Sequence, residues 1–277
     1  MIRFAFAAAL GAALPALVLP AWACPVELDR ARITQGALVV GTVAPGARVE
    51  FAQRNVRVDA ATGAFVLGFE RDAPAEMALV VACPDGTRAA IKLAVKKRKY
   101  SIERIDGLPE AQVTPPPELL ERIRREDALI RAARADDNPL PHFLRGFLWP
   151  ARGRLSGFYG DQRILNGEPR APHLGLDIAG PVGTQILATA AGTVTMAEHD
   201  LFYTGGTVVI DHGHGVNSVY SHLSEVEVAL GDRVAPAQEI GRMGKTGRVT
   251  GPHLHFNINW FQLRLDPALV LGPPPPR

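Results

Sequence analysis

Histidines near the C-terminal end of this 277-residue chain have a spacing that points to chemistry. The segment His253-Leu254-His255-Phe256-Asn257 alternates polar and apolar residues, which is the period of a β-strand. On such a strand His253, His255 and Asn257 point to one face, so two imidazoles enter the same cavity. Asn257 follows them on that face and is a candidate hydrogen-bond partner for the pair.

A second pair of possible ligands, His173 and Asp177, is separated by three residues. If this stretch is a strand, positions 173, 175 and 177 share a face, and Gly175 leaves room for a metal ion. A catalytic zinc ion typically has three protein ligands and one open position for water. Two histidines and one aspartate would supply those ligands and leave the site with a net charge of roughly +1.

His222 lies in a further polar and apolar alternation, between Val219 and Leu223. The pattern predicts a strand with His222 on its polar side. A single histidine on such a strand is more often structural than catalytic. We therefore interpret His222 as functional only because other candidate histidines are expected close to it.

A rival metal pair, His212 and His214, has the same spacing as His253 and His255. Glycines at positions 213 and 215 follow an apolar strand there, which favours a tight turn that would hold ligands loosely. His142 and His199 have no partner by spacing, and we interpret them as surface residues.

The elements that must position these side chains are predicted to be mainly β. Residues 24–98 alternate short β-rich runs with turn signals, which indicates a small N-terminal β-sandwich. This region has no catalytic cluster, so a binding, spacing or shielding role is expected. The runs cover residues 37–43, 48–51, 56–59, 64–69, 77–82 and 89–95.

Residues 99–146 are expected to form a linker that carries a helix over 118–135. Apolar residues follow one side of the helical period, and we interpret the charged opposite side as a solvated face. A second domain, which carries the histidine pairs described above, covers residues 147–270. A proline-rich tail, residues 271–277, cannot extend a helix or a central strand and should be exposed.

The N-terminus has the pattern of an export signal. Residues 1–23 contain a basic start, an apolar run and an Ala21-Trp22-Ala23 cleavage site, so we predict a cleaved signal peptide and no integral membrane domain afterwards. An uncleaved anchor and a lipoprotein are the alternatives. Cys24 and Cys83 would pair in an oxidising compartment or remain two free thiols.

Composition excludes some classes of function. With 47% hydrophobic and 21% charged residues, the chain has the balance of an ordinary globular protein. A formal net charge of +2 is too mild for nucleic-acid binding, which usually shows as a dense basic face. Weak attraction to an anionic cell envelope is compatible with this charge.

Several motifs in residues 150–268, in a fixed order, resemble the lysostaphin-like peptidoglycan metallopeptidases. This resemblance implies a catalytic domain built as a β-sheet-rich duplicated hybrid motif. The motifs are His173-Leu-Gly-Leu-Asp177, Ala191-Gly192-Thr193-Val194, Gly205-Gly206-Thr207-Val208, Tyr220-Ser221-His222-Leu223-Ser224, Gly241-Arg-Met-Gly244-Lys-Thr-Gly247 and Thr250-Gly251-Pro252-His253-Leu254-His255-Phe256.

The resemblance also implies roles for individual residues. One Zn²⁺ per chain would be held by His173, Asp177 and His255. His222 and His253 would be catalytic, placing or deprotonating the attacking water and stabilising the oxyanion. Many members carry an acidic residue where this chain has Asn257, so the surroundings of the metal ligands differ here.

The implied function is a periplasmic zinc metalloendopeptidase that hydrolyses cross-links between peptidoglycan stem peptides, with envelope regulatory proteins as further partners. The alternative is an inactive envelope protein that binds and activates peptidoglycan amidases. Degenerate members usually lose metal ligands, whereas all five expected positions are filled here, which favours the enzyme. A peptidase acting on other peptides is a third reading. The resemblance also implies that regions N-terminal to the catalytic domain often regulate access to its substrate-binding groove.

Overall fold

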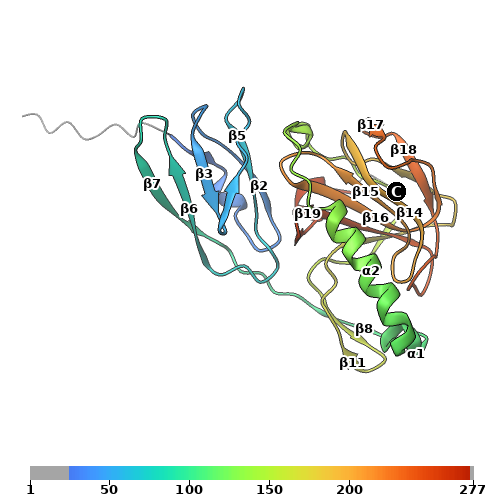
Figure 1. Cartoon of the computed structure of the whole chain (residues 1–277). Coiled ribbons are helices and arrows are strands. Elements are labelled where there is room, and N and C mark those ends of the chain that lie inside the picture. The colour runs from blue at the N-terminus through green and yellow to red at the C-terminus, as the bar shows by residue number, and fades with distance from the viewer. Residues whose placement is uncertain (1–24, 275–277) are drawn as a thin grey trace, which may run out of the picture.

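A computed structural model describes residues 25–274 of the chain, apart from the side chains of residues 111 and 112. The expected signal peptide and Cys24 lie outside the described residues, so cleavage and a Cys24–Cys83 disulfide stay predictions. The fold is mainly β, as predicted: a β-sandwich and a larger β-domain are joined by a segment that contains one long helix (Figure 1). Within residues 25–274, no helix is long and apolar enough to cross a bilayer.

The N-terminal unit packs a three-stranded sheet, ordered β1-β2-β5, against a four-stranded sheet, ordered β4-β3-β6-β7. Strand β4 covers residues 54–56, against a predicted 56–59, because Ala52 and Gln53 adopt positive φ and form a tight turn directly after β3. The elements are β1 (Glu27–Leu28), a 3-10 turn (Arg30–Arg32), β2 (Leu38–Thr42), β3 (Arg48–Phe51), β4 (Arg54–Val56), β5 (Ala64–Gly68), β6 (Glu76–Ala82) and β7 (Arg88–Ala94).

The segment expected to be a linker contains more structure than predicted. Strand β8 (Ile102–Ile105) pairs in parallel with β10 of the larger domain, and a short helix α1 (Glu110–Val113) follows it. Helix α2 covers Pro117–Ala133, against an expected 118–135, and a 3-10 turn covers His142–Arg145. Pro117 suits the first helical position, because the amide hydrogen that proline lacks would have no helical acceptor there.

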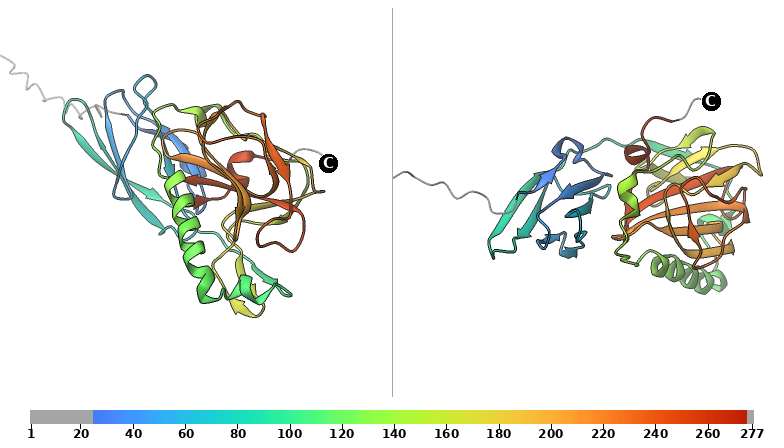
Figure 2. Two further views of the ribbon diagram at one scale, coloured as in Figure 1. Left: turned by 45° about the vertical axis from the view of Figure 1, so that its right-hand side comes forward. Right: turned by 90° about the horizontal axis from the view of Figure 1, so that it is seen from above.

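Helix α2 lies along one face of the larger sheet (Figures 1 and 2). Its Ile130 and Ala133 pack against apolar residues of β14, β15 and β16. The charged side is only partly solvated, contrary to the sequence interpretation. Glu126 is buried, where it accepts hydrogen bonds from Arg122 and from the backbone amide of Phe202. These bonds fix the helix to the loop that follows β14.

The larger domain is built on a ten-stranded sheet with the main order β17-β14-β15-β16-β19-β12-β9. Its core contains side chains from the central strands, among them Ile178, Tyr220 and Phe256. A small separate sheet is ordered β11-β10-β8. The elements are β9 (Arg154–Gly157), β10 (Gln162–Leu165), β11 (Glu168–Pro169), β12 (Leu176–Ala179), β13 (Gln185–Leu187), β14 (Gly192–Leu201), β15 (Gly205–Asp211), β16 (Val216–Val226), β17 (Arg233–Val234), β18 (Glu239–Met243), β19 (His253–Trp260), β20 (Leu263–Leu265) and α3 (Ala268–Leu271).

The sandwich and the larger domain share one hydrophobic cluster. Trp260, at the end of β19, lies with its ring 6.1 Å from that of Phe51 of the sandwich. Gly68 permits this approach, since a Cβ there would lie 2.8 Å from the Cβ of Trp260. The Arg54 guanidinium lies 3.8 Å from the ring of Phe261. The two units are therefore packed together and not merely tethered.

Candidate metal centre

Strand register brings Asp177 and His255 together. Strands β12 and β19 are antiparallel neighbours in which Asp177 and His255 are directly paired, so their side chains emerge on the same face. His173 lies in the loop before β12, not in a strand as the alternation suggested. Its backbone is nevertheless fixed, because its N–H donates to the Asp161 carbonyl and its carbonyl accepts from Gly160.

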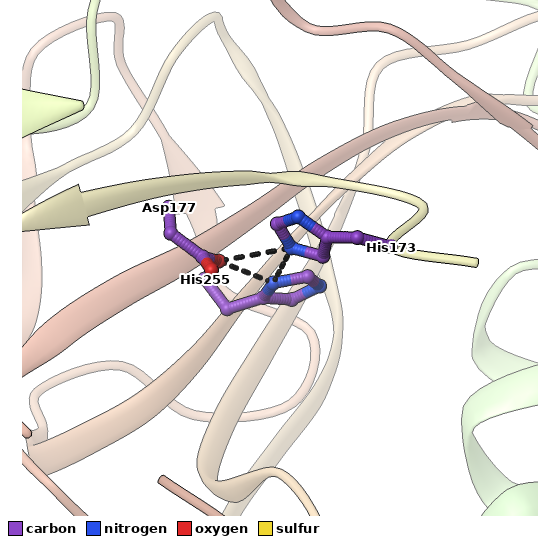
Figure 3. Close-up of side chains that lie close together, drawn as sticks. All are labelled: His173, Asp177 and His255. Atoms are coloured by element: carbon purple, nitrogen blue, oxygen red, sulfur yellow. Dashed lines mark hydrogen bonds and ion pairs between the residues drawn. The ribbon is translucent and has the colours of Figure 1, made fainter. Parts of the chain in front are cut away.

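Three donor atoms converge at this point (Figure 3). Asp177 Oδ1 lies 2.7 Å from His255 Nδ1 and 3.1 Å from His173 Nε2. The two ring nitrogens are 3.0 Å apart. The structure thus places these three predicted residues side by side from segments 78 residues apart in the chain.

This donor set fits a divalent zinc ion. Zinc binds imidazole nitrogen and carboxylate oxygen at about 2.0–2.2 Å, so tetrahedral ligand atoms are about 3.3 Å from one another. The observed separations of 2.7 to 3.1 Å need only a small outward shift of the side chains. Three ligands leave one tetrahedral position for water or substrate.

Neighbouring groups orient the two imidazoles. His173 Nδ1 lies 3.1 Å from the Phe158 carbonyl, to which it donates, so its Nε2 carries the lone pair toward the cluster. Asn257 donates to the Leu174 carbonyl at 2.6 Å, and its amide nitrogen also lies 3.2 Å from His255 Nε2. Asn257 therefore contacts the ring nitrogen of His255 that faces away from the cluster, the position proposed for it from the sequence.

His222 and His253 lie beside the three-residue cluster in the same pocket. Their ring centroids are 4.9 Å apart, and His253 Nε2 is 3.9 Å from Asp177 Oδ1. Each Nδ1 is within 2.9 Å of a backbone carbonyl, that of Thr246 or Gly251, to which it donates. Each imidazole therefore keeps Nε2 as its remaining proton acceptor.

The backbone of His222 is unusual. Its φ is +69°, a left-handed value within strand β16 that is uncommon for residues other than glycine. The neighbouring Ser221 is paired with His255, so strict alternation would have turned His222 to the other face. We attribute the placement of the His222 ring near His253 to this local departure. Backbone strain of this kind is frequent at functional sites.

Electrostatics keep the cluster in a metal-binding protonation state. Burial alone would raise the pKa of Asp177, but the contacts of its carboxylate with the His173 and His255 rings hold that pKa well below its usual range. Burial lowers the pKa of His255 to about 4 and that of His222 to about 3. At neutral pH Asp177 is therefore a carboxylate and His255 a neutral imidazole, which are the forms that bind metal.

Two glycines make room for the cluster. A Cβ at Gly175 would lie 2.6 Å from His255 Cε1 and would also crowd the Asn257 side chain. Sequence reasoning missed Gly157 of β9, where a Cβ would overlap the Asp177 carboxylate and lie 2.9 Å from His173 Cε1. A single glycine at the end of a short strand does not indicate a neighbouring site, so the sequence could not identify Gly157 as part of this one.

The pocket also includes residues from the segment expected to be a linker. Glu103 and Ile105 of β8, together with Leu108, line the cavity that contains His222, His253 and His255. Arg163 of β10 lines it as well. No sequence motif marked these positions, because β8 reaches the site only by pairing with a strand that lies about 60 residues later in the chain.

The rival pair His212 and His214 lies in a turn, as the glycines around it indicated. His212 contacts the Ala191 carbonyl at 2.7 Å and the Ser218 hydroxyl at 2.8 Å, and His214 contacts the Pro139 carbonyl at 3.2 Å. Neither belongs to a metal-type cluster among the described residues. His142 is half-buried and His199 is exposed.

Acid is expected to destabilise the folded chain through His212. Burial lowers its pKa to about 4, whereas an unfolded histidine has a pKa near 6.5. Between these values the unfolded chain binds a proton that the folded chain does not. The free energy of unfolding should therefore fall as pH drops from about 6.5 to about 4, by roughly 3 kcal/mol in total.

Denaturant unfolding at pH 7 and pH 5 measures this effect. His212→Gln should lose less stability on acidification than the unmodified chain, even if it starts from a lower value. An equal loss in both proteins would mean that His212 does not cause the acid sensitivity.

Comparison with solved structures extends over both units. A crystal structure of a peptidase M23 protein from Pseudomonas aeruginosa superimposes with a TM-score of 0.69 and 31% identity, covering 87% of this chain and 95% of that one. The chain belongs to peptidase family M23. The sequence profile named Peptidase family M23 matches residues 171–267, which include the cluster, His222 and His253. The predicted family resemblance is therefore confirmed.

Curated relatives of this M23 protein match over part of the chain. The peptidoglycan DD-endopeptidase ShyA of Vibrio cholerae is 40% identical over 109 residues, which are 39% of this chain and 25% of the relative. The DD-carboxypeptidase/endopeptidase Mpg of Neisseria meningitidis is 40% identical over 103 residues, 37% of this chain and 24% of the relative. The match spans about a quarter of the length of these M23 relatives.

Proposed function

We propose that this M23 protein is a zinc-dependent endopeptidase that hydrolyses peptide cross-links of peptidoglycan. The observation that carries the proposal is the convergence of His173, Asp177 and His255, beside a pocket that Asp177 and His255 line together with two further imidazoles. The names of the relatives, peptidoglycan DD-endopeptidases among them, support the substrate class. A periplasmic location after cleavage of residues 1–23 is part of the same proposal.

His173, Asp177 and His255 would hold the ion, and a bound zinc ion would supply Lewis-acid chemistry that makes water a nucleophile near neutral pH. The chain's own groups do the rest. His222 and His253 present Nε2 to the pocket, so either can accept the proton of an attacking water and return it to the leaving amine. A protonated imidazole beside the scissile carbonyl can also donate to the developing oxyanion.

Incubation of purified sacculi with the full-length mature chain tests this function. We expect cross-linked muropeptide dimers to decrease, and a chelator to stop the decrease until zinc is restored. The readout is separation of muropeptides after digestion of the glycan strands. Cleavage that continues in the chelator would contradict the role of the metal. Intact dimers, with faster cleavage by an added amidase, would instead favour the amidase-activating alternative.

A further inference from the structure

Arg163 of β10 lies between two carboxylates at the edge of the metal centre. Its Nε is 3.0 Å from Glu103 Oε2, and its Nη2 is 3.5 Å from Asp177 Oδ2. The three side chains are 21%, 25% and 9% exposed, in the order Arg163, Glu103 and Asp177. The guanidinium is therefore partly shielded from water, where ion pairs are stronger than on an open surface.

The two oxygens of Asp177 have different partners. Oδ1 faces His173 and His255, whereas Oδ2 faces Arg163. A carboxylate that is held at one oxygen cannot turn freely, so Oδ1 stays directed at the two imidazoles. Hydrogen-bond donors of this kind orient metal-binding carboxylates, and their loss weakens metal binding.

Glu103 is itself fixed by strand pairing. Arg163 and Glu103 are direct partners in the parallel pair of β10 and β8. The strand is tied at both ends: the Ser101 amide donates to Asp161 at 3.0 Å, and the Asn166 side chain donates to the Leu108 carbonyl at 2.8 Å. The carboxylate of Glu103 is thus presented to Arg163 by a short, well-anchored strand.

The charges also fit a neighbouring cation site. A lone guanidinium close to a metal ligand would repel a divalent ion. Glu103 offsets that charge at 3.0 Å, so Arg163 can hold Asp177 with little net repulsion of the metal. The Arg163–Glu103 pair therefore contacts Asp177 while adding no net formal charge beside the candidate metal site.

We propose that Arg163 is a positioning residue for the metal-binding carboxylate of Asp177, and that Glu103 of β8 sets the position of Arg163. The segment ahead of the catalytic domain is then part of the metal centre. This inference rests on the proposed function only in that Asp177 binds a metal ion.

Zinc affinity of the full-length chain tests the inference, measured by competition with a chromophoric chelator. Arg163→Ala should raise the Kd for Zn²⁺ by about 10–100-fold. Arg163→Lys should recover part of the loss, because it keeps the charge without the planar fork. Glu103→Ala should raise the Kd less, and the double variant should match Arg163→Ala alone, because Glu103 acts through Arg163.

Arg242 supplies a matched control, since it also lies between two carboxylates, Glu227 and Glu239, but does not line the pocket. Arg242→Ala should leave the zinc Kd unchanged. Thermal unfolding in chelator checks that each variant is folded. If Arg163→Ala does not fold, Arg163→Lys and its double variant with Glu103→Ala carry the same comparison.

An unchanged or tighter zinc Kd in the Arg163 variants would overturn the inference, and so would additive losses from Arg163 and Glu103. The proposed function fails separately. If zinc affinity depends on Arg163 and Glu103 as expected but the chain leaves sacculi intact, the inference is supported and the proposed endopeptidase function is contradicted. If the chain cleaves sacculi but Arg163→Ala keeps the zinc affinity of the unmodified protein, the proposed function is supported and the inference is contradicted.

Discussion

His255→Ala is expected to abolish both zinc binding and the cleavage of cross-linked muropeptides. His255 Nδ1 is the donor nearest to Asp177 Oδ1, at 2.7 Å, and its removal leaves only two ligands. Lewis-acid activation contributes several kcal/mol, so the rate should fall by about a thousandfold or more. Metal content of the purified variant and muropeptide release from sacculi are the two measurements.

His214→Asn is the matched control for this prediction, since His214 has a φ of +53°, which asparagine tolerates. His214 is also a buried histidine of the same domain, but it contacts Pro139 and lies outside the cluster. Zinc content and cleavage should survive in this variant. A His255→Ala protein that keeps one zinc ion per chain would show that the ion is held elsewhere, and the cluster would lose its assigned role.

The second large effect is expected at His222 and His253, where activity should fall while zinc stays bound. General acid–base groups contribute about 10²–10⁴ to the rate. Neither imidazole is needed to complete the three-ligand set, so the metal content should remain near that of the unmodified chain. The measurement pairs turnover of a cross-linked muropeptide with zinc content.

His222→Asn is preferable to alanine at this position, because the residue has a φ of +69° and asparagine tolerates left-handed backbone. His253→Ala serves at the other position. Loss of zinc together with activity in both variants would make them ligands or structural residues. Full activity in both would remove them from the chemistry.

Much of the site could be predicted because its residues lie on regular strands. The alternation from His253 to Asn257 follows β19, and the pairing of Asp177 with His255 brings the two motifs together. The strands of the sandwich could be predicted for the same reason, since alternating residues and turn glycines are local signals. The sequence allows a strand from His173 to Asp177, whereas His173 lies in the loop before β12, where Asp161 and Gly160 hold its backbone.

Features that depend on distant pairing could not be predicted. Strand β8 is four residues long, and its partner β10 begins 60 residues after Ile102, so no local pattern marks it. Arg163 and Glu103 each resemble an ordinary surface charge until that pairing is known. The burial of Glu126 on α2 could not be predicted for the same reason. Its carboxylate accepts a hydrogen bond from the Phe202 amide, which lies in a loop far along the chain.

Strand β19 carries His253 and His255 at one end and Trp260, which packs into the sandwich, at the other. The same eight residues therefore belong both to the candidate metal centre and to the junction between the two units. Exchange of this domain with that of another family member is consequently not a simple modular swap. A graft would have to bring apolar partners for Trp260 and Phe261, or replace these aromatic side chains with polar ones.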